Sequence, residues 1–273
     1  MAVRKRPALD SAEAGEASER QAPSSRIVHA AILQEGEEEV KRSASALIWS
    51  AFAAGLSLGF SLVGEALLRA HLPEATWRPL IEAFGYSIGF LIVILGRQQL
   101  FTENTLTPIL PLLDRDSKVS LRQVGRLWGL VLFGNLAGAL VFALAFEHTG
   151  ILGGDVKAAA HEIGQEALTS GFMLVLLRGV AAGWLVALIV WLLPVAETAH
   201  VWIILVITWL IAAAKFSHVI AGAIDVFVLA SSHGASWGEV LGEFIVPALL
   251  GNIIGGVTLV AFLNHAQVKS GGG

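Results

Sequence analysis

The chain has 273 residues, of which 55% are hydrophobic and 15% charged, with a mean hydropathy of +0.70. This composition predicts a protein that crosses a membrane several times. The absence of cysteine excludes disulfides, thiolate metal sites and a cysteine nucleophile. The net charge of −4 comes without a basic stripe, so nothing indicates nucleic-acid binding.

Residues 1–42 are rich in Ala, Glu, Ser and Arg and contain no apolar run, so they predict neither a signal peptide nor a membrane span. We expect a cytoplasmic tail that includes a solvated helix from about Ala30 to Arg42. The large apolar residues of that helix are Ile32, Leu33 and Val40. A gating role for the tail is a second interpretation.

Six apolar stretches follow, each long enough for a hydrocarbon core of about 30 Å. They cover residues 44–67, 80–113, 123–146, 171–194, 201–230 and 238–264. We therefore expect a transmembrane domain at 43–266 and a short cytoplasmic tail at 267–273. Lys and Arg accumulate in cytoplasmic loops. Placing both chain ends in the cytoplasm leaves only Arg69, Arg78 and Lys157 outside, which favours this orientation.

The longest external segment, residues 147–170, contains several histidines and carboxylates. It lacks the second histidine that the helix of a zinc protease needs after His161-Glu162. We therefore expect an amphipathic surface helix, begun by Asp155 as its cap, and no metal site.

Polar residues interrupt two of the apolar stretches near their middles. The first interruption reads Arg97-Gln98-Gln99-Leu100-Phe101-Thr102-Glu103-Asn104, and the second reads Lys215-Phe216-Ser217-His218. An ionisable side chain at bilayer depth costs about 2.5–3.5 kcal/mol even on insertion scales. The interruptions therefore indicate a path for a substrate.

The two halves of the expected domain repeat each other. Gly134-Asn135 in the third stretch and Gly251-Asn252 in the sixth are offset by 117 residues. In the interruptions, Phe101-Thr102 and the pair Phe216 and His218 are offset by 115 and 116. Each half has three spans, an odd number, so the second half enters from the opposite side and the repeats are inverted. Inverted repeats with a broken helix in each half are typical of transporters and channels that bind solutes at the membrane midplane.

Glycine pairs four residues apart occur in five of the six stretches, and we interpret them as helix-packing positions only. They are Gly55/Gly59, Gly85/Gly89, Gly134/Gly138, Gly179/Gly183 and Gly251/Gly255.

Residues 44–264 resemble the formate/nitrite transporter family of anion channels and transporters. The resemblance rests on Leu100-Phe101-Thr102, on Phe216 and His218 with Ile220-Ala221, and on the paired Gly-Asn motifs. It implies an all-α membrane protein of six transmembrane helices in two inverted three-helix repeats, with the second and fifth helices broken, in an aquaporin-like arrangement. It also implies an inner-membrane homopentamer with one pore in each subunit. The substrates implied are small monovalent anions or their acids, such as formate, nitrite, lactate, acetate or hydrosulfide.

By position, the resemblance implies that Phe101 and Phe216 form pore constrictions and that Thr102 faces a central His218. The chemistry of these residues agrees, because an anion meets a large desolvation penalty at an apolar constriction and its neutral acid does not. An imidazole can attract the anion when charged or pass it a proton. The alternative is that His218 has a structural role only and forms its hydrogen bonds within the packed helices.

Three positions depart from the family pattern. Ser217 stands where glutamate is common, and Gly183 and Gly222 stand where asparagines are expected. A buried unpaired charge is costly, so we predict that Lys215 pairs across the pore with Glu103.

Three further ionisable residues need partners. Asp225 lies seven residues beyond His218, on a similar helix face, and we expect it to pair with Arg97 or Arg178. Alternatively, one of these arginines faces a vestibule and attracts anions.

Other function classes fit less well. A serine hydrolase would need a base for Ser217 or for the serines of Ser231-Ser232-His233, but adjacent helical residues do not face each other and no Gly-x-Ser-x-Gly elbow occurs. We expect no enzyme and no cofactor. A channel for small neutral solutes is the main alternative, because Ser and Gly in place of Glu and Asn would enlarge the site. A sensor without transport is a third. The expected pathway residues are Leu100, Phe101, Thr102, Glu103, Lys215, Phe216, Ser217 and His218.

Overall fold

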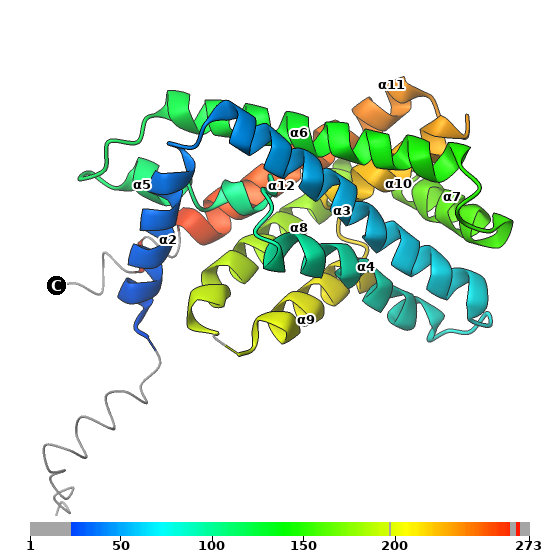
Figure 1. Cartoon of the computed structure of the whole chain (residues 1–273). Helices are drawn as coiled ribbons and strands as arrows, with labels where there is room; N and C mark the ends of the chain where they lie inside the picture. Colours follow the sequence, from blue (N-terminus) through cyan, green and yellow to red (C-terminus); the bar gives the residue numbers. More distant parts are fainter. Residues whose placement is uncertain (1–22, 197, 263–265, 268–273) are drawn as a thin grey trace, which may run out of the picture.

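The computed structural model describes residues 23–196, 198–262 and 266–267, and every regular element among them is a helix (Figure 1). The predicted all-helical fold class is confirmed. The first half contains α2 (Ser25–Glu39), α3 (Ala44–His71), α4 (Arg78–Leu95), η1 (Glu103–Thr105), α5 (Ile109–Leu113) and α6 (Leu121–His148). Then follow α7 (Gly154–Leu168), α8 (Phe172–Leu192), η2 (Leu193–Val195), α9 (His200–Ala213), α10 (Val219–Ser231), α11 (Trp237–Glu239), η3 (Val240–Ile245), α12 (Val246–Ile254) and η4 (Gly255–Phe262).

Two of the predicted apolar stretches are each divided into two helices. Residues 96–108, which include the short 3₁₀-helix η1, separate α4 from α5, and residues 214–218 separate α9 from α10. We call these segments the first and the second break. The last stretch is continuous, because α11, the π-helix η3, α12 and the π-helix η4 follow one another without a gap.

One closely packed pair of helices builds the core of each half. In the first half α3 packs against α6, and in the second half α8 packs against α12. A Cβ atom on Gly55 would lie 2.2 Å from the carbonyl oxygen of Asn135, and one on Gly183 would lie 2.3 Å from that of Asn252. No side chain fits at such distances, so the interpretation of these glycines as packing positions is confirmed.

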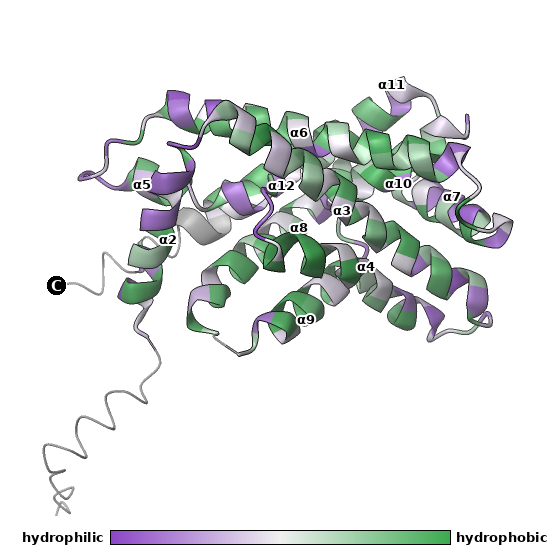
Figure 2. Ribbon diagram, viewed as in Figure 1, coloured by the Kyte–Doolittle hydropathy of each residue, from purple (hydrophilic) through white to green (hydrophobic). Residues whose placement is uncertain are grey.

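The surface of the bundle suits a membrane. Among the described residues, five helical stretches are long and apolar enough to cross one, and α9 and α10 are shorter apolar helices. The five are Ala44–His71, Arg78–Leu95, Leu121–His148, Phe172–Val195 and Trp237–Thr258. Hydrophilic residues gather at the two ends, on α2 and the α5–α6 connection at one end and on α7 at the other (Figure 2). The large exposed apolar side chains include Trp49, Phe133, Met173 and Trp202. Exposing so large an apolar surface to water would be unfavourable. The count of six spans stays a prediction.

The N-terminal helix differs from the expected solvated helix. It spans Ser25–Glu39, and Val28, Ile32 and Gly36 on one of its faces are buried. This face packs on the first break and on α5, in an apolar cluster with Leu106, Ile109 and Leu110. A Cβ atom on Gly36 would lie 2.0 Å from the carbonyl oxygen of Thr107. The expectation of a solvated leader is therefore wrong for this helix. Residues 1–22 and 268–273 of the expected tails lie outside the described residues.

The external segment forms the expected amphipathic helix, α7, with Val156, Ala160 and Ile163 on its buried face. Its predicted cap is wrong. Gly153 is the capping residue, and Asp155 lies in the first turn, where a negative charge still favours the helix dipole. Helix α7 packs against α10 and α3. It therefore covers one end of the bundle.

Candidate substrate pathway

The second residue of each break is a basic residue in the left-handed conformation. Arg97 follows α4 with a φ angle of 53°, and Lys215 follows α9 with a φ angle of 54°. A positive φ is uncommon for a residue other than glycine and turns the chain sharply away from the helix axis. The same unusual turn therefore opens both breaks.

An asparagine from α6 holds the first break in place. The side-chain amide of Asn135 donates hydrogen bonds to the carbonyl oxygens of Ala51 and Gln99, both at 2.8 Å. Its Oδ1 accepts a hydrogen bond from the backbone N–H of Phe101 at 2.9 Å. Asn135 is fully buried. It satisfies backbone groups that an unwound segment leaves unpaired, as an apolar surrounding requires.

An asparagine from α12 holds the second break in the same way. Asn252 donates to the carbonyl oxygens of Gly179 at 2.9 Å and Ser217 at 2.8 Å, and accepts from the N–H of Val219 at 2.9 Å. The matched contacts define how the breaks correspond. Phe101 and Val219 are equivalent, at an offset of 118 residues.

The predicted correspondence of the Phe-Thr and Phe-x-His motifs is therefore wrong. Offsets of 115 and 116 pair Phe101 with Phe216 and Thr102 with His218, whereas the structural offset of 118 makes Leu100 the counterpart of His218. The motifs look alike in sequence but occupy different points of the two breaks. His218 and Thr102 meet across the repeat without being equivalent.

His218 and Thr102 are in direct contact at the centre of the molecule. Oγ1 of Thr102 lies 2.8 Å from Nε2 of His218, and both residues are at most 1% exposed. Nδ1 of His218 accepts a hydrogen bond from the N–H of Ala221 at 3.2 Å and so caps α10. Because Nδ1 is an acceptor, the neutral imidazole carries its proton on Nε2. The Phe90 ring meets the imidazole edge to face at 4.9 Å.

Two cavities lie on either side of this contact. A chamber of about 120 Å³, which we call the outer chamber after the expected orientation of the chain, is lined by residues of the second break and of α3, α4, α7 and α10. A cavity of about 810 Å³, the inner cavity, lies between α2 and the first break. Of the expected pathway residues, Lys215, Phe216, Ser217 and His218 line the outer chamber, Glu103 lines the inner cavity, and Leu100, Phe101 and Thr102 are buried.

The predicted ion pair of Lys215 with Glu103 is wrong, because the two breaks open into different cavities. Nζ of Lys215 lies 2.7 Å from Oε2 of Glu166 on α7. Oε1 of Glu166 lies 3.0 Å from Nη1 of Arg69. Burial alone would raise the pKa of Glu166, but the hydrogen bond from Lys215 and the charge of Arg69 lower it below its usual value.

The predicted partners of Asp225 are wrong as well. Arg97 lies 3.2 Å from Glu35 of α2, and Arg178 donates a hydrogen bond of 2.7 Å to Oγ of Ser170. Within the described part of the chain, Asp225 pairs with neither arginine. Arg178 lines the outer chamber and Arg97 the inner cavity, which agrees with the alternative that an arginine faces a vestibule.

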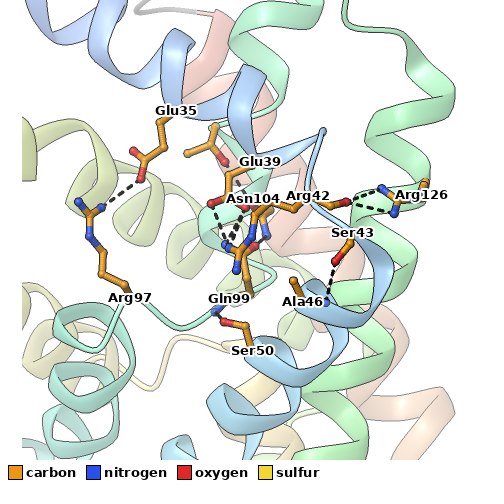
Figure 3. A network of polar contacts seen from close by, with 11 residues as sticks. Glu35, Glu39, Arg42, Ser43, Ala46, Ser50, Arg97, Gln99, Asn104 and Arg126 are labelled. Atoms are coloured by element: carbon orange, nitrogen blue, oxygen red, sulfur yellow. Dashed lines mark hydrogen bonds and ion pairs between the residues drawn. The ribbon is translucent and has the colours of Figure 1, made fainter.

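A polar network ties α2 to the first break (Figure 3). Glu39 lies 3.2 Å from Nη1 of Arg42 and accepts a hydrogen bond of 2.9 Å from the side chain of Gln99. Gln99 in turn accepts a hydrogen bond of 3.0 Å from Asn104. Burial raises the pKa of Glu39, and the charge of Arg42 only partly offsets this. Helix α2 is thus held to side chains of the first break.

Comparison with known proteins identifies the family. A family model described as formate/nitrite transporter matches residues 26–266. The chain belongs to the formate/nitrite transporter family. It is 37% identical over 243 residues to inner membrane protein YfdC of Escherichia coli, covering 89% of this chain and 78% of that one. It is 27% identical over 243 residues to the formate channel BtFdhC of Bacillus thuringiensis, covering 86% and 92%. The family consists of transporters and channels, in agreement with the rejection of a serine hydrolase.

Solved structures share the fold. A structure described as an FNT family ion channel aligns with a TM-score of 0.79 at 20% identity, covering 89% of this chain and 99% of its own. A pentameric formate channel with formate bound aligns with a TM-score of 0.70 at 24% identity, covering 83% and 98%.

The sequence analysis missed an aromatic residue, Phe244. Its ring occupies the space beside Gly222, one of the three positions that depart from the family pattern. A Cβ atom on Gly222 would lie 2.1 Å from Cζ of Phe244, whose ring lines the outer chamber. At Gly183 the backbone of Asn252 leaves no room for an asparagine side chain. The glycines therefore do not enlarge the site at these two points. No sequence signal links Gly222 to Phe244, since the contact depends on how η3 crosses α10.

Proposed function

We propose that this member of the formate/nitrite transporter family carries small monovalent anions or their conjugate acids through a pore in each subunit. His218 is the central group, and Phe101 and Phe216 form the constrictions. The buried contact of 2.8 Å between His218 and Thr102, between two cavities, carries this proposal. A relative named a formate channel supports the choice of substrate class.

The neutral imidazole of His218 suits an anion. Its Nε2–H donates to Thr102 and can instead donate to a carboxylate or nitrite oxygen that displaces the hydroxyl. The surrounding Phe90 and Phe101 favour a neutral or weakly hydrated species. A substrate that arrives as an acid, or becomes one in the pore, avoids most of the desolvation penalty.

We infer an inner-membrane homopentamer with both ends in the cytoplasm. One relative is named an inner membrane protein, and a structural neighbour is described as a pentameric channel. Val28 of α2 and Val257 of η4 belong to one apolar cluster, which supports placing both ends on the same side. The apolar outer surface leaves room for lipid and for neighbouring subunits.

A channel for small neutral solutes remains the competing proposal. Ser217 in place of glutamate favours it, since a hydroxyl group handles neutral solutes as well as anions. Phe244 opposes it, because its ring occupies the space beside Gly222.

Flux measurements in proteoliposomes distinguish the two. For the anion transporter, formate uptake should rise as the external pH falls and should be lost in His218→Ala. Because His218 also caps α10, the matched control is His218→Asn, whose side-chain oxygen keeps the cap and removes the imidazole. Passage of urea that is indifferent to pH, without formate uptake, would establish the neutral-solute channel instead.

A further inference from the structure

The outer chamber contains two carboxyl groups without a described partner. Glu65 of α3 and Asp225 of α10 both line it, and neither forms a hydrogen bond or an ion pair with another described residue. Asp225 is only 9% exposed. A carboxyl group this deeply buried ordinarily has a partner. Tyr86 of α4 lines the same chamber.

The other charged groups of the chamber have partners. Nζ of Lys215 lies 2.7 Å from Glu166, Arg69 lies 3.0 Å from both Glu82 and Glu166, and Arg178 donates to Ser170 at 2.7 Å. Helix η3 contributes the uncharged Phe244. The groups left to act on a solute are therefore the two carboxyls, the phenol of Tyr86 and His218.

His218 alone is a poor proton donor in this arrangement. Its Nδ1 is engaged by the N–H of Ala221, so taking up a second proton there would break the cap of α10. Giving up the Nε2 proton without that step would leave an imidazolate, which is far less stable than a carboxylate. An anion that must become an acid in the outer chamber therefore needs another proton source.

We propose that Asp225 and Glu65 form a proton-loading site of the outer chamber, which protonates the permeating anion before it reaches His218. Asp225 follows His218 by seven residues of α10, about 10 Å along the helix towards the outer end. The inference rests on the proposed function and deepens it. In this proposal, the anion is transported together with a proton that is taken from the outer side.

The transfer step is a simple exchange between oxygens. The O–H bond of the protonated Asp225 carboxyl breaks while an O–H bond to the substrate oxygen forms, and Asp225 is left as a carboxylate. Glu65 transfers its proton to Asp225 and is then protonated by a hydronium ion from the solution at the outer mouth, which leaves as water. The neutral acid then passes Phe216 towards His218.

Carboxyl-to-amide variants test the site in proteoliposomes with formate as the probe. In Asp225→Asn combined with Glu65→Gln, we expect the ratio of uptake at external pH about 5.5 to that at about 7.5 to fall to about 1, because the proton source is lost. The wild type keeps a ratio of about 10, and proton uptake accompanies its formate uptake. The matched control is Glu162→Gln, an exposed carboxyl of α7 outside the chamber, which should keep the wild-type profile.

The outcomes separate the two proposals. If the wild type carries no formate, the proposed function fails. If the wild type shows the pH-dependent uptake and the double variant keeps it, only the proton-loading site is overturned. Formate uptake that requires Na⁺ at constant pH would also overturn it, because the two carboxyls would then hold a cation.

A measurement on the wild type covers the case in which the double variant does not fold. Infrared difference spectra between acidic and neutral pH should show the band of a protonated carboxyl group. The band should weaken in each single variant, Asp225→Asn and Glu65→Gln, and persist in Glu162→Gln. Absence of a titrating carboxyl band in the wild type across the pH range of transport would contradict the proposal.

Discussion

Lys215 turns the chain at the start of the second break, and its ammonium group rests on Glu166 of α7. The two side chains are 56% and 45% exposed, and an ion pair in that setting contributes about 0–1 kcal/mol to stability. The contact therefore does little for folding. It fixes a positive charge at the outer chamber and joins α7 to the second break.

A double-mutant cycle tests this pairing. We expect Lys215→Met and Glu166→Gln to be coupled in formate flux, so that the double variant resembles either single variant. Lys215→Met and Glu103→Gln should instead act independently, because their side chains line separate cavities. Coupling of Lys215 with Glu103 and independence from Glu166 would contradict the structure.

The resemblance to the family implied the contact of Thr102 with His218, and the inverted repeats predicted only that the two interruptions lie at one midplane site. The partner of Lys215 could not. Predicting it requires knowing that the breaks open to different cavities and that α7 folds back over the outer chamber. Attraction between opposite charges gave the wrong partner, Glu103, because it contains no information on which side each break opens.

At the scale of elements, two helix pairs depend on close backbone contact. Gly183→Leu should lower stability by about 1–3 kcal/mol or more, since its Cβ would meet the carbonyl oxygen of Asn252 at 2.3 Å. Gly129→Leu on α6 has nothing within 4 Å of its added Cβ and should be tolerated. The temperature at which the detergent-solubilised protein loses its size-exclusion peak measures the difference. Equal loss in both variants would contradict the role of close packing at Gly183.

The docking of α2 should depend on pH through Glu39. Burial holds the pKa of Glu39 above its usual value when α2 is docked, so the docked helix binds a proton more tightly than the released one. Docking is therefore strongest below the ordinary glutamate pKa and weakens as the pH rises through the raised pKa. Hydrogen exchange of residues 25–39, corrected for intrinsic rates, should be slower at acidic pH. Glu39→Gln should remove the difference, and Glu38→Gln, an exposed neighbour, should keep it.

Apolar length and periodicity predicted where the helices lie but not what α2 touches. Its buried positions, Val28 and Ile32, are too few to distinguish a docked helix from a solvated one by pattern alone. The docking depends on the shape of the first break and of α5, where Leu106 and Leu110 present an apolar surface. This surface forms only because the chain is not helical through the first break.

For the whole molecule, the orientation of the chain in the membrane remains a prediction, and the absence of cysteine makes it easy to test. Asp155→Cys on α7 and Arg115→Cys on the α5–α6 connection both place a thiol at an exposed position. In intact spheroplasts, a maleimide that cannot cross the membrane should label Asp155→Cys only. Arg115→Cys should react after lysis. The reverse pattern would place both chain ends outside.

The asparagine contacts also bear on how the protein is made. Asn135 follows Gln99 by 36 residues and Asn252 follows Ser217 by 35, so each break is synthesised well before the side chain that satisfies its backbone. Until then, its carbonyl and N–H groups need water or the insertion machinery as partners. Each half can enter the lipid in its final form only when its last helix has arrived. On the predicted count of six spans, we therefore expect the three helices of each half to complete their insertion together.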